Sequence, residues 1–126
     1  MNKSRLTLAS LALTVVLAAC SSTTAAPASS VKPADADVTV VARDMKFVQP
    51  EIRVKADAAF SLLLRNGDGM PHNVAIYTDS SATSPLFVGE MVTDGEIVYD
   101  IPALKAGTYY FRCDLHPDMR GAIVAS

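Results

Sequence analysis

Apolar and polar residues alternate in short segments from Val38 to the end of the chain. In one segment charged residues flank Ile52 and Val54, and in the next Phe60, Leu62 and Leu64 occupy every second position. A period of two over about four to eight residues is typical of a half-buried β-strand, and no apolar stripe with a helical period is present. The pattern predicts strands over residues 38–41, 51–55, 60–64, 73–77, 96–101, 108–113 and 121–125.

Turn-forming residues separate the expected strands, most clearly at Asn66-Gly67-Asp68-Gly69 and Thr93-Asp94-Gly95. About seven to eight short strands joined by such turns predict an all-β fold, an antiparallel Greek-key β-sandwich. The least regular loop, residues 78–85, has room for a helical turn. The inward-facing residues of the sandwich are expected to be Val40, Ile52, Val54, Phe60, Leu62, Leu64, Val74, Ile76, Val98, Tyr109, Phe111 and Ile123.

The strand expected over residues 108–113 ends at a cysteine. Tyr109, Phe111 and Cys113 share one face of this strand because side chains alternate between its two sides. The thiol is therefore expected on the core side. Tyr109 also follows Leu104-Lys105-Ala106-Gly107 in the arrangement of a tyrosine corner, in which the hydroxyl group bonds to the backbone shortly upstream.

The first 19 residues have the features of an export signal. Lys3 and Arg5 precede fourteen uncharged residues, a run too short to span a membrane comfortably. The run ends in Leu17-Ala18-Ala19-Cys20, which resembles the lipobox of bacterial lipoproteins and implies cleavage before Cys20 and lipidation of that residue. An ordinary secreted protein cleaved after Ala19, or an uncleaved anchor, is the alternative. Residues 20–37 are then a lipidated cysteine and a flexible tether rich in Ser, Thr, Ala and Pro, and residues 38–126 are one domain.

Composition narrows the functional classes. The chain has 126 residues, 50% of them hydrophobic, which suits a single domain. Removal of residues 1–19 lowers the number of Lys and Arg from 11 to 9 and leaves 13 Asp and Glu, so the formal net charge changes from −2 to −4. Such a charge excludes a basic nucleic-acid-binding surface. A disulfide between Cys20 and Cys113 would suit an oxidising compartment, but lipidation gives Cys20 a different use.

A candidate metal site lies near the carboxyl end, where Cys113, His116 and Met119 follow one another at three-residue intervals. His72 is the only other histidine in the chain. Two histidines and a cysteine in a trigonal arrangement, with a weak axial methionine, form a site that selects copper. Structural zinc prefers closed sets of Cys and His. A binuclear copper centre needs a second cysteine in the loop. A buried structural Cys113, or a nucleophilic Cys113 activated by His116, are further alternatives.

Two sequence stretches resemble the cupredoxins, the small blue copper proteins of the amicyanin and plastocyanin type. They are Met70-Pro71-His72-Asn73-Val74 and the residues from Tyr109 to Met119, and residues 45–54 are similar to the opening strands of that family. The resemblance covers the domain from Val38 to Ser126. It implies one copper ion held by His72, Cys113, His116 and Met119, with Asn73 linking the two ligand segments. Asp114 and Leu115 stand where related proteins often have small residues or proline, and the Asp114 and Asp118 side chains are interpreted as solvated loop charges.

These observations predict an electron carrier and not an enzyme. Copper would cycle between Cu(I) and Cu(II), and electrons would pass through the edge of His116, framed by an apolar patch of Met70, Leu115 and Pro117. The expected partners are a redox donor and a redox acceptor, both membrane-associated, that dock transiently on a monomer held by its lipid on the periplasmic or extracytoplasmic side of a membrane. A lipoprotein that stores or delivers copper with the same ligands is the alternative. A scaffold domain with a decayed site is a third.

Overall fold

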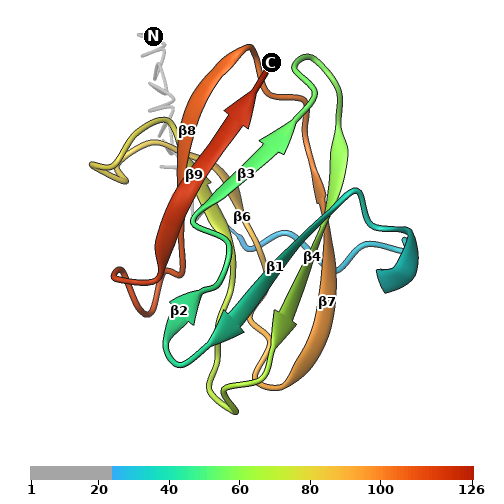
Figure 1. Cartoon of the computed structure of the whole chain (residues 1–126), viewed down its shortest axis with the longest axis vertical. Helices are drawn as coiled ribbons and strands as arrows, with labels where there is room; N and C mark the ends of the chain where they lie inside the picture. The colour runs from blue at the N-terminus through green and yellow to red at the C-terminus, as the bar shows by residue number, and fades with distance from the viewer. Residues whose placement is uncertain (1–23) are drawn as a thin grey trace, which may run out of the picture.

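Nine short strands form two sheets in residues 24–126, the part of the chain that this computed structural model describes (Figure 1). The four-stranded sheet has the order β2-β1-β4-β7 and the five-stranded sheet has the order β3-β9-β8-β5-β6. The strands are β1 (Val38–Arg43), β2 (Lys46–Phe47), β3 (Glu51–Val54), β4 (Phe60–Asn66), β5 (Ala75–Tyr77), β6 (Pro85–Val88), β7 (Gly95–Ile101), β8 (Gly107–Arg112) and β9 (Arg120–Ala125), and one 3-10 helix, η1, spans Pro33–Asp35.

The expected β-sandwich is confirmed, with three differences in detail. All seven predicted strands are present, and β2 and β6 are additional. Both sheets are mixed, because β1 pairs with β4 and β3 pairs with β9 in parallel, whereas the other neighbours are antiparallel. The loop after β5 forms hydrogen-bonded turns, with Ala82 N–H donating to the Asp79 carbonyl, and no helical turn.

The core between the sheets contains most of the predicted residues. Ten of the twelve are buried, and Val54 and Tyr109 are half-buried at its margin. Val98 is buried but lies outside the central cluster, opposite its cross-strand partner Leu63. Strand β7 has apolar residues on both faces. The alternation of residues alone therefore does not show that Val98 faces away from the central cluster. The core cluster also includes Cys113 and Met119, so the candidate site is continuous with it.

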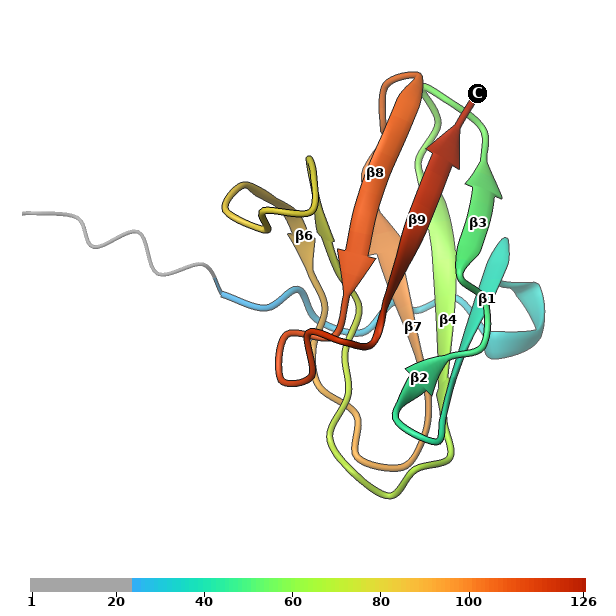
Figure 2. The same ribbon diagram turned by 60° about the vertical axis from the view of Figure 1, so that its left-hand side comes forward.

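Residues 26–31, named here the strap, cross the open side of the sandwich between two edge strands (Figures 1 and 2). The Ala26 N–H donates to the carbonyl of Val88, a residue of β6, at 2.7 Å. The Ala26 carbonyl accepts a hydrogen bond from the Glu90 N–H. Ser29 N–H donates to the Val98 carbonyl at 2.6 Å on β7, and its hydroxyl donates to Asp100. The strap belongs to the segment expected to be a flexible tether, and from Ala26 onward that segment is hydrogen-bonded to the domain.

The tyrosine corner at the start of β8 is confirmed, because the Tyr109 hydroxyl donates to the Lys105 carbonyl at 2.9 Å. This bond fixes the turn that leads into β8, the strand that Cys113 directly follows. The signal segment and Cys20 lie outside the described residues. Within residues 24–126 there is no helix with the length and apolarity needed to cross a bilayer.

Candidate metal centre

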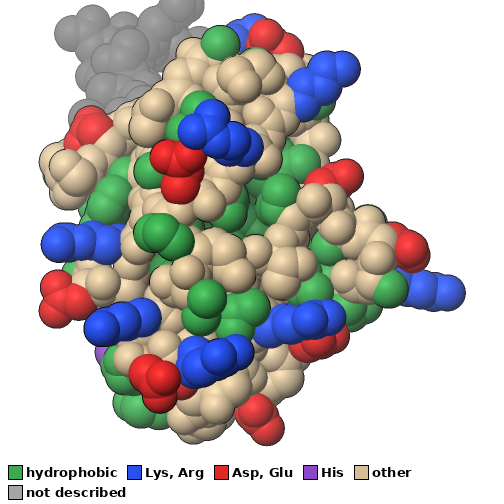
Figure 3. All heavy atoms as spheres, in the orientation of Figure 1, with side chains coloured by type: hydrophobic (Ala, Val, Ile, Leu, Met, Phe, Trp, Pro, Cys, Tyr) green, Lys and Arg blue, Asp and Glu red, His purple; other side chains and the backbone are tan. Residues whose placement is uncertain are grey.

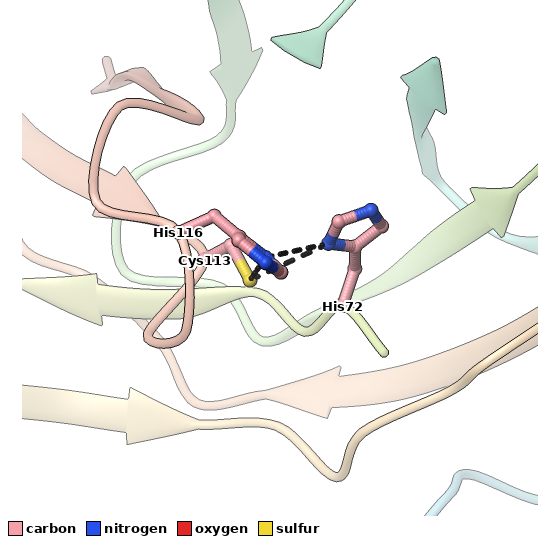
Figure 4. A group of neighbouring side chains, drawn as sticks. All are labelled: His72, Cys113 and His116. Atoms are coloured by element: carbon pink, nitrogen blue, oxygen red, sulfur yellow. Dashed lines mark hydrogen bonds between the residues drawn. The ribbon is translucent and has the colours of Figure 1, made fainter. Parts of the chain in front are cut away.

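Three predicted ligand atoms converge at one end of the sandwich (Figure 4). The Nδ1 atoms of His72 and His116 are 3.1 Å apart, and the Cys113 sulfur lies 3.7 Å from each of them. The centre of a triangle with these sides is about 2 Å from each corner, close to the metal–nitrogen and metal–sulfur distances of protein sites. The three side chains therefore leave space for one metal ion to contact them all.

Strand β8 and the loop after it position the second half of the site. Cys113 directly follows β8 and its side chain is fully buried. The Cys113 N–H donates to the Met119 carbonyl and the Met119 N–H donates to the His116 carbonyl, both at 2.9 Å. These bonds close the ligand loop on itself. Met119 is 1% exposed and belongs to the core, and His116 is half-buried.

The segment that carries His72 is held by a buried asparagine. His72 is fully buried, and its backbone exchanges two hydrogen bonds with Val92 at 2.9 and 3.0 Å. Asn66, 3% exposed, donates through its amide nitrogen to the carbonyl groups of Met70, Val92 and Thr93. It therefore ties the connection between β4 and β5 to the segment before β7. The sequence analysis did not predict this structural role of Asn66. The one feature of the sequence that could have indicated it is a polar amide side chain at the end of an apolar strand.

Asn73 joins the two ligand-bearing segments. Its side-chain oxygen accepts from the Asp114 N–H at 2.9 Å, and its amide nitrogen donates to the Gly89 carbonyl at 3.0 Å. Asn73 is 1% exposed, so both bonds are shielded from water. The residue after His72 is thus bonded to the residue after Cys113, which is the link that the family resemblance implies.

The interpretation of Asp114 as a solvated charge is wrong. Its carboxylate accepts a hydrogen bond from the Tyr77 hydroxyl at 2.6 Å and one from Arg112 Nε at 3.3 Å. The Arg112 guanidinium also lies 5.0 Å from the centre of the Tyr77 ring. Burial and the neighbouring Asp114 raise the pKa of Tyr77 above its ordinary value. The fold brings Tyr77 beside the loop from β5, a proximity that the sequence spacing does not reveal.

The rim of the site is apolar and accessible. Met70 and Leu115 are 44% and 55% exposed, and Pro117 is also exposed beside half-buried His116. A groove of about 430 Å³ follows the same edge. It is lined by Asp44, Met45, Lys46, Leu115, His116, Pro117, Asp118 and Met119.

The donor set fits copper better than the other metals considered. A thiolate and two imidazoles, with a buried thioether in the same short loop, suit copper, whereas structural zinc sites are completed by further Cys or His. Cys113 is a free, buried cysteine, and it is the only cysteine among residues 24–126, so a two-cysteine binuclear centre has no second thiolate there.

Comparisons with known proteins agree with this geometry. Residues 9–125 match the family described as a cupredoxin-like domain. Amicyanin of Paracoccus versutus is 39% identical over 92 residues, which cover 73% of this chain and 66% of that protein. Amicyanin-alpha of Methylorubrum extorquens is 32% identical over 119 residues, which cover 90% of this chain and 96% of the relative.

Solved structures give the same result. The crystal structure of P. versutus amicyanin has a TM-score of 0.59 at 38% identity, and the match covers 75% of this chain and 85% of that chain. A variant of amicyanin solved with Cu(I) has a TM-score of 0.58 at 28% identity, with 76% and 90% coverage. The fold, the ligand geometry and the matched residues agree, and the chain belongs to the cupredoxin-like family.

Proposed function

We propose that this protein is a type 1 copper protein that carries single electrons between redox partners. The observation that supports this function best is the convergence of the Cys113 sulfur and the Nδ1 atoms of His72 and His116 within 3.7 Å of one another. The buried Met119 side chain would be the fourth residue that holds the copper. The bound copper supplies a one-electron couple between Cu(I) and Cu(II).

The protein's contribution is a site that resists rearrangement. His72 is fixed by its two backbone bonds to Val92, and Cys113 by its bond to Met119. Asn73 connects the two ligand segments through the Asp114 N–H. Ligands held next to strand ends and by buried hydrogen bonds keep one geometry when the charge of the site changes, and a small rearrangement favours fast electron transfer.

Electrons enter and leave at the exposed edge of His116 in this proposal. Met70, Leu115 and Pro117 surround that edge with apolar surface suited to a small, transient interface. Positive and negative side chains are interspersed on the face of the domain seen in Figure 3. In this proposal the apolar patch is the docking position for a redox donor and a redox acceptor.

We also propose that Cys20 is lipidated and that the protein works as a monomer on the periplasmic or extracytoplasmic surface of a membrane. The support is the leader sequence that ends in Leu17-Ala18-Ala19-Cys20. Two acyl chains on one residue are sufficient for stable membrane attachment. The donor and acceptor are then membrane-associated proteins.

Addition of Cu(II) to the metal-free protein tests the electron-carrier function. We expect one copper per chain and an intense visible thiolate-to-copper band, which reversible reduction removes while the copper stays bound. The band should be absent from Cys113→Ser and unchanged in the matched control Cys20→Ser, which should instead move the protein out of the membrane fraction. A wild-type protein that binds Cu(II) without colour would contradict the proposal.

The second candidate function is copper storage or delivery with the same ligands. Three exposed methionines favour it, because Met45, Met70 and Met91 offer soft thioethers for Cu(I) and are 38%, 44% and 38% exposed. Measurement of Cu(I) transfer separates the two functions. Rapid transfer of Cu(I) to an acceptor protein supports delivery, whereas retention of copper through repeated oxidation and reduction supports electron transfer.

A further inference from the structure

Asp68 contacts the buried ligand His72 on the side away from the metal centre. The His72 Nε2 atom lies 3.1 Å from an Asp68 carboxylate oxygen, and the two side chains are 0% and 10% exposed. The other ring nitrogen, Nδ1, faces Cys113 and His116. A neutral imidazole carries one N–H, and a carboxylate can only accept. The proton is therefore held at Nε2, which leaves the Nδ1 lone pair free for a metal.

The same carboxylate also binds the turn between β1 and β2. It accepts hydrogen bonds from the backbone N–H groups of Asp44 at 2.7 Å and Met45 at 3.2 Å. These two residues have φ angles of 54° and 58°, a left-handed conformation that is uncommon for residues other than glycine. Asp68 thus supplies acceptors that hold a turn of unfavourable backbone conformation.

That turn forms one wall of the groove beside His116, the half-buried ligand. Met45 lines the groove together with His116 and Pro117. Asp68 itself is fixed, because its own N–H donates to the Asn66 side-chain oxygen at 3.0 Å. One carboxylate therefore connects the buried ligand with the surface on which the proposed partners dock.

We propose that Asp68 is a positioning residue of the copper site, which selects the metal-binding tautomer of His72 and couples its ring to the β1–β2 turn. The inference deepens the proposed electron-carrier function. The negative charge of Asp68, hydrogen-bonded to a ligand, stabilises the more positive Cu(II) state and so lowers the reduction potential.

Three variants separate the hydrogen bond from the charge. Asp68→Ala removes both the hydrogen-bond acceptor and the charge. Asp68→Asn keeps an acceptor oxygen but removes the charge. Asp68→Glu keeps the acceptor and the charge on a longer side chain. Asp94→Asn is the control, because it removes the same charge from an exposed loop residue.

The first measurement needs no copper. Nitrogen-15 NMR of the metal-free protein should show the His72 ring proton on Nε2, protected from exchange, in the wild type and in Asp68→Asn. In Asp68→Ala we expect a mixture of tautomers and faster exchange of the Asp44 and Met45 amides. Unchanged tautomer and exchange in Asp68→Ala would overturn the proposal, and this result is independent of whether the protein carries electrons.

The second measurement is the reduction potential of the copper-loaded variants. It should rise in Asp68→Asn by more than in Asp94→Asn, and Asp68→Glu should restore much of the wild-type value. Equal shifts in Asp68→Asn and Asp94→Asn would contradict a specific electrostatic role. If Asp68→Ala does not fold, Asp68→Asn and Asp68→Glu still decide the question. Absence of a coloured copper site in the wild type would instead contradict the proposed function itself.

Discussion

At the scale of single residues, Gly121 on β9 shows how closely that strand packs against β8, the strand before Cys113. A Cβ atom at this position would lie 2.6 Å from the Phe111 ring and 2.7 Å from the Pro50 carbonyl oxygen. Phe111 is fully buried and lies two residues before the ligand Cys113. A side chain at residue 121 would therefore push on the strand that aims the thiol.

Gly121→Ala is expected to destabilise the metal-free protein. Insertion of a methyl group into a closely packed contact typically costs about 1–3 kcal/mol, because neither the buried ring nor the backbone carbonyl can move freely. Urea denaturation should show this loss in the free energy of unfolding. Gly67→Ala is the matched control, since a Cβ there meets nothing within 4 Å, and it should change stability by less than about 0.5 kcal/mol. Equal effects of the two substitutions would refute the packing argument.

The sequence was sufficient to predict the candidate metal ligands, but not the residues that support them. Cys113, His116 and Met119 share one short loop and His72 is the only other histidine, so chemistry and count single them out as candidates. The roles of Asn66 and Asp68 depend on which carbonyl and amide groups the fold brings near their side chains. Val92 and Thr93 lie more than twenty residues from Asn66, and Asp44 and Met45 lie more than twenty residues from Asp68, so no local pattern records their proximity.

At the scale of elements, the strap protects two strand edges. Strands β6 and β7 each end a sheet, and unpaired edge strands tend to pair with other chains. The strap bonds to β6 through Ala26 and to β7 through Ser29. A segment that is rich in Ser, Ala and Pro can therefore be ordered by backbone hydrogen bonds even though it buries little apolar surface.

Ala26→Pro is expected to loosen the strap. Proline has no N–H, so the 2.7 Å bond to the Val88 carbonyl is lost. The Glu90 amide, which donates to the Ala26 carbonyl, should then exchange its hydrogen faster, whereas the Val92 amide bonded to His72 should keep its protection. Hydrogen exchange measures both amides. Ala25→Pro, one residue earlier and exposed, is the control. Unchanged exchange at Glu90 in Ala26→Pro would argue against an ordered strap.

Strands were predictable where apolar and polar residues alternate regularly, and they were not predictable where this alternation is absent. The seven alternating segments all form strands, whereas Pro85-Leu86-Phe87-Val88 has no alternation and its strand was missed. A period of two also carries no information about direction. The parallel pairs β1–β4 and β3–β9 are set by the order in which the chain connects the two sheets.

At the scale of the whole molecule, one buried tyrosine links stability to alkaline pH. Tyr99 is fully buried, and its hydroxyl donates to the Glu90 carbonyl at 2.7 Å. Burial raises the pKa of Tyr99 far above its ordinary value of 10.0. The folded protein therefore keeps this proton at a pH where the unfolded chain releases it. Its stabilising contribution is complete below pH 10 and is lost as the pH rises toward the folded pKa.

Tyr99→Phe should reduce the alkaline sensitivity of the metal-free protein. In the wild type, release of the Tyr99 proton by the unfolded chain lowers stability by about 1.4 kcal/mol between pH 8 and pH 11, and phenylalanine has no such proton. The difference in the free energy of unfolding between wild type and Tyr99→Phe should therefore be constant from pH 7 to pH 8 and change by about that amount by pH 11. A difference that stays constant to pH 11 would show that Tyr99 does not cause the effect.

The strap also limits how far the domain can stand from a bilayer. If Cys20 carries lipid as proposed, the Ala26 hydrogen bond to β6, the first within residues 24–126, comes only six residues later. An extended chain spans at most about 3.5 Å per residue, so the segment from Cys20 to Ala26 spans at most about 20 Å. A free segment from Cys20 to Val38 would span about 60 Å. Electron exchange would then be confined to partners whose redox groups lie in a thin layer above the same membrane.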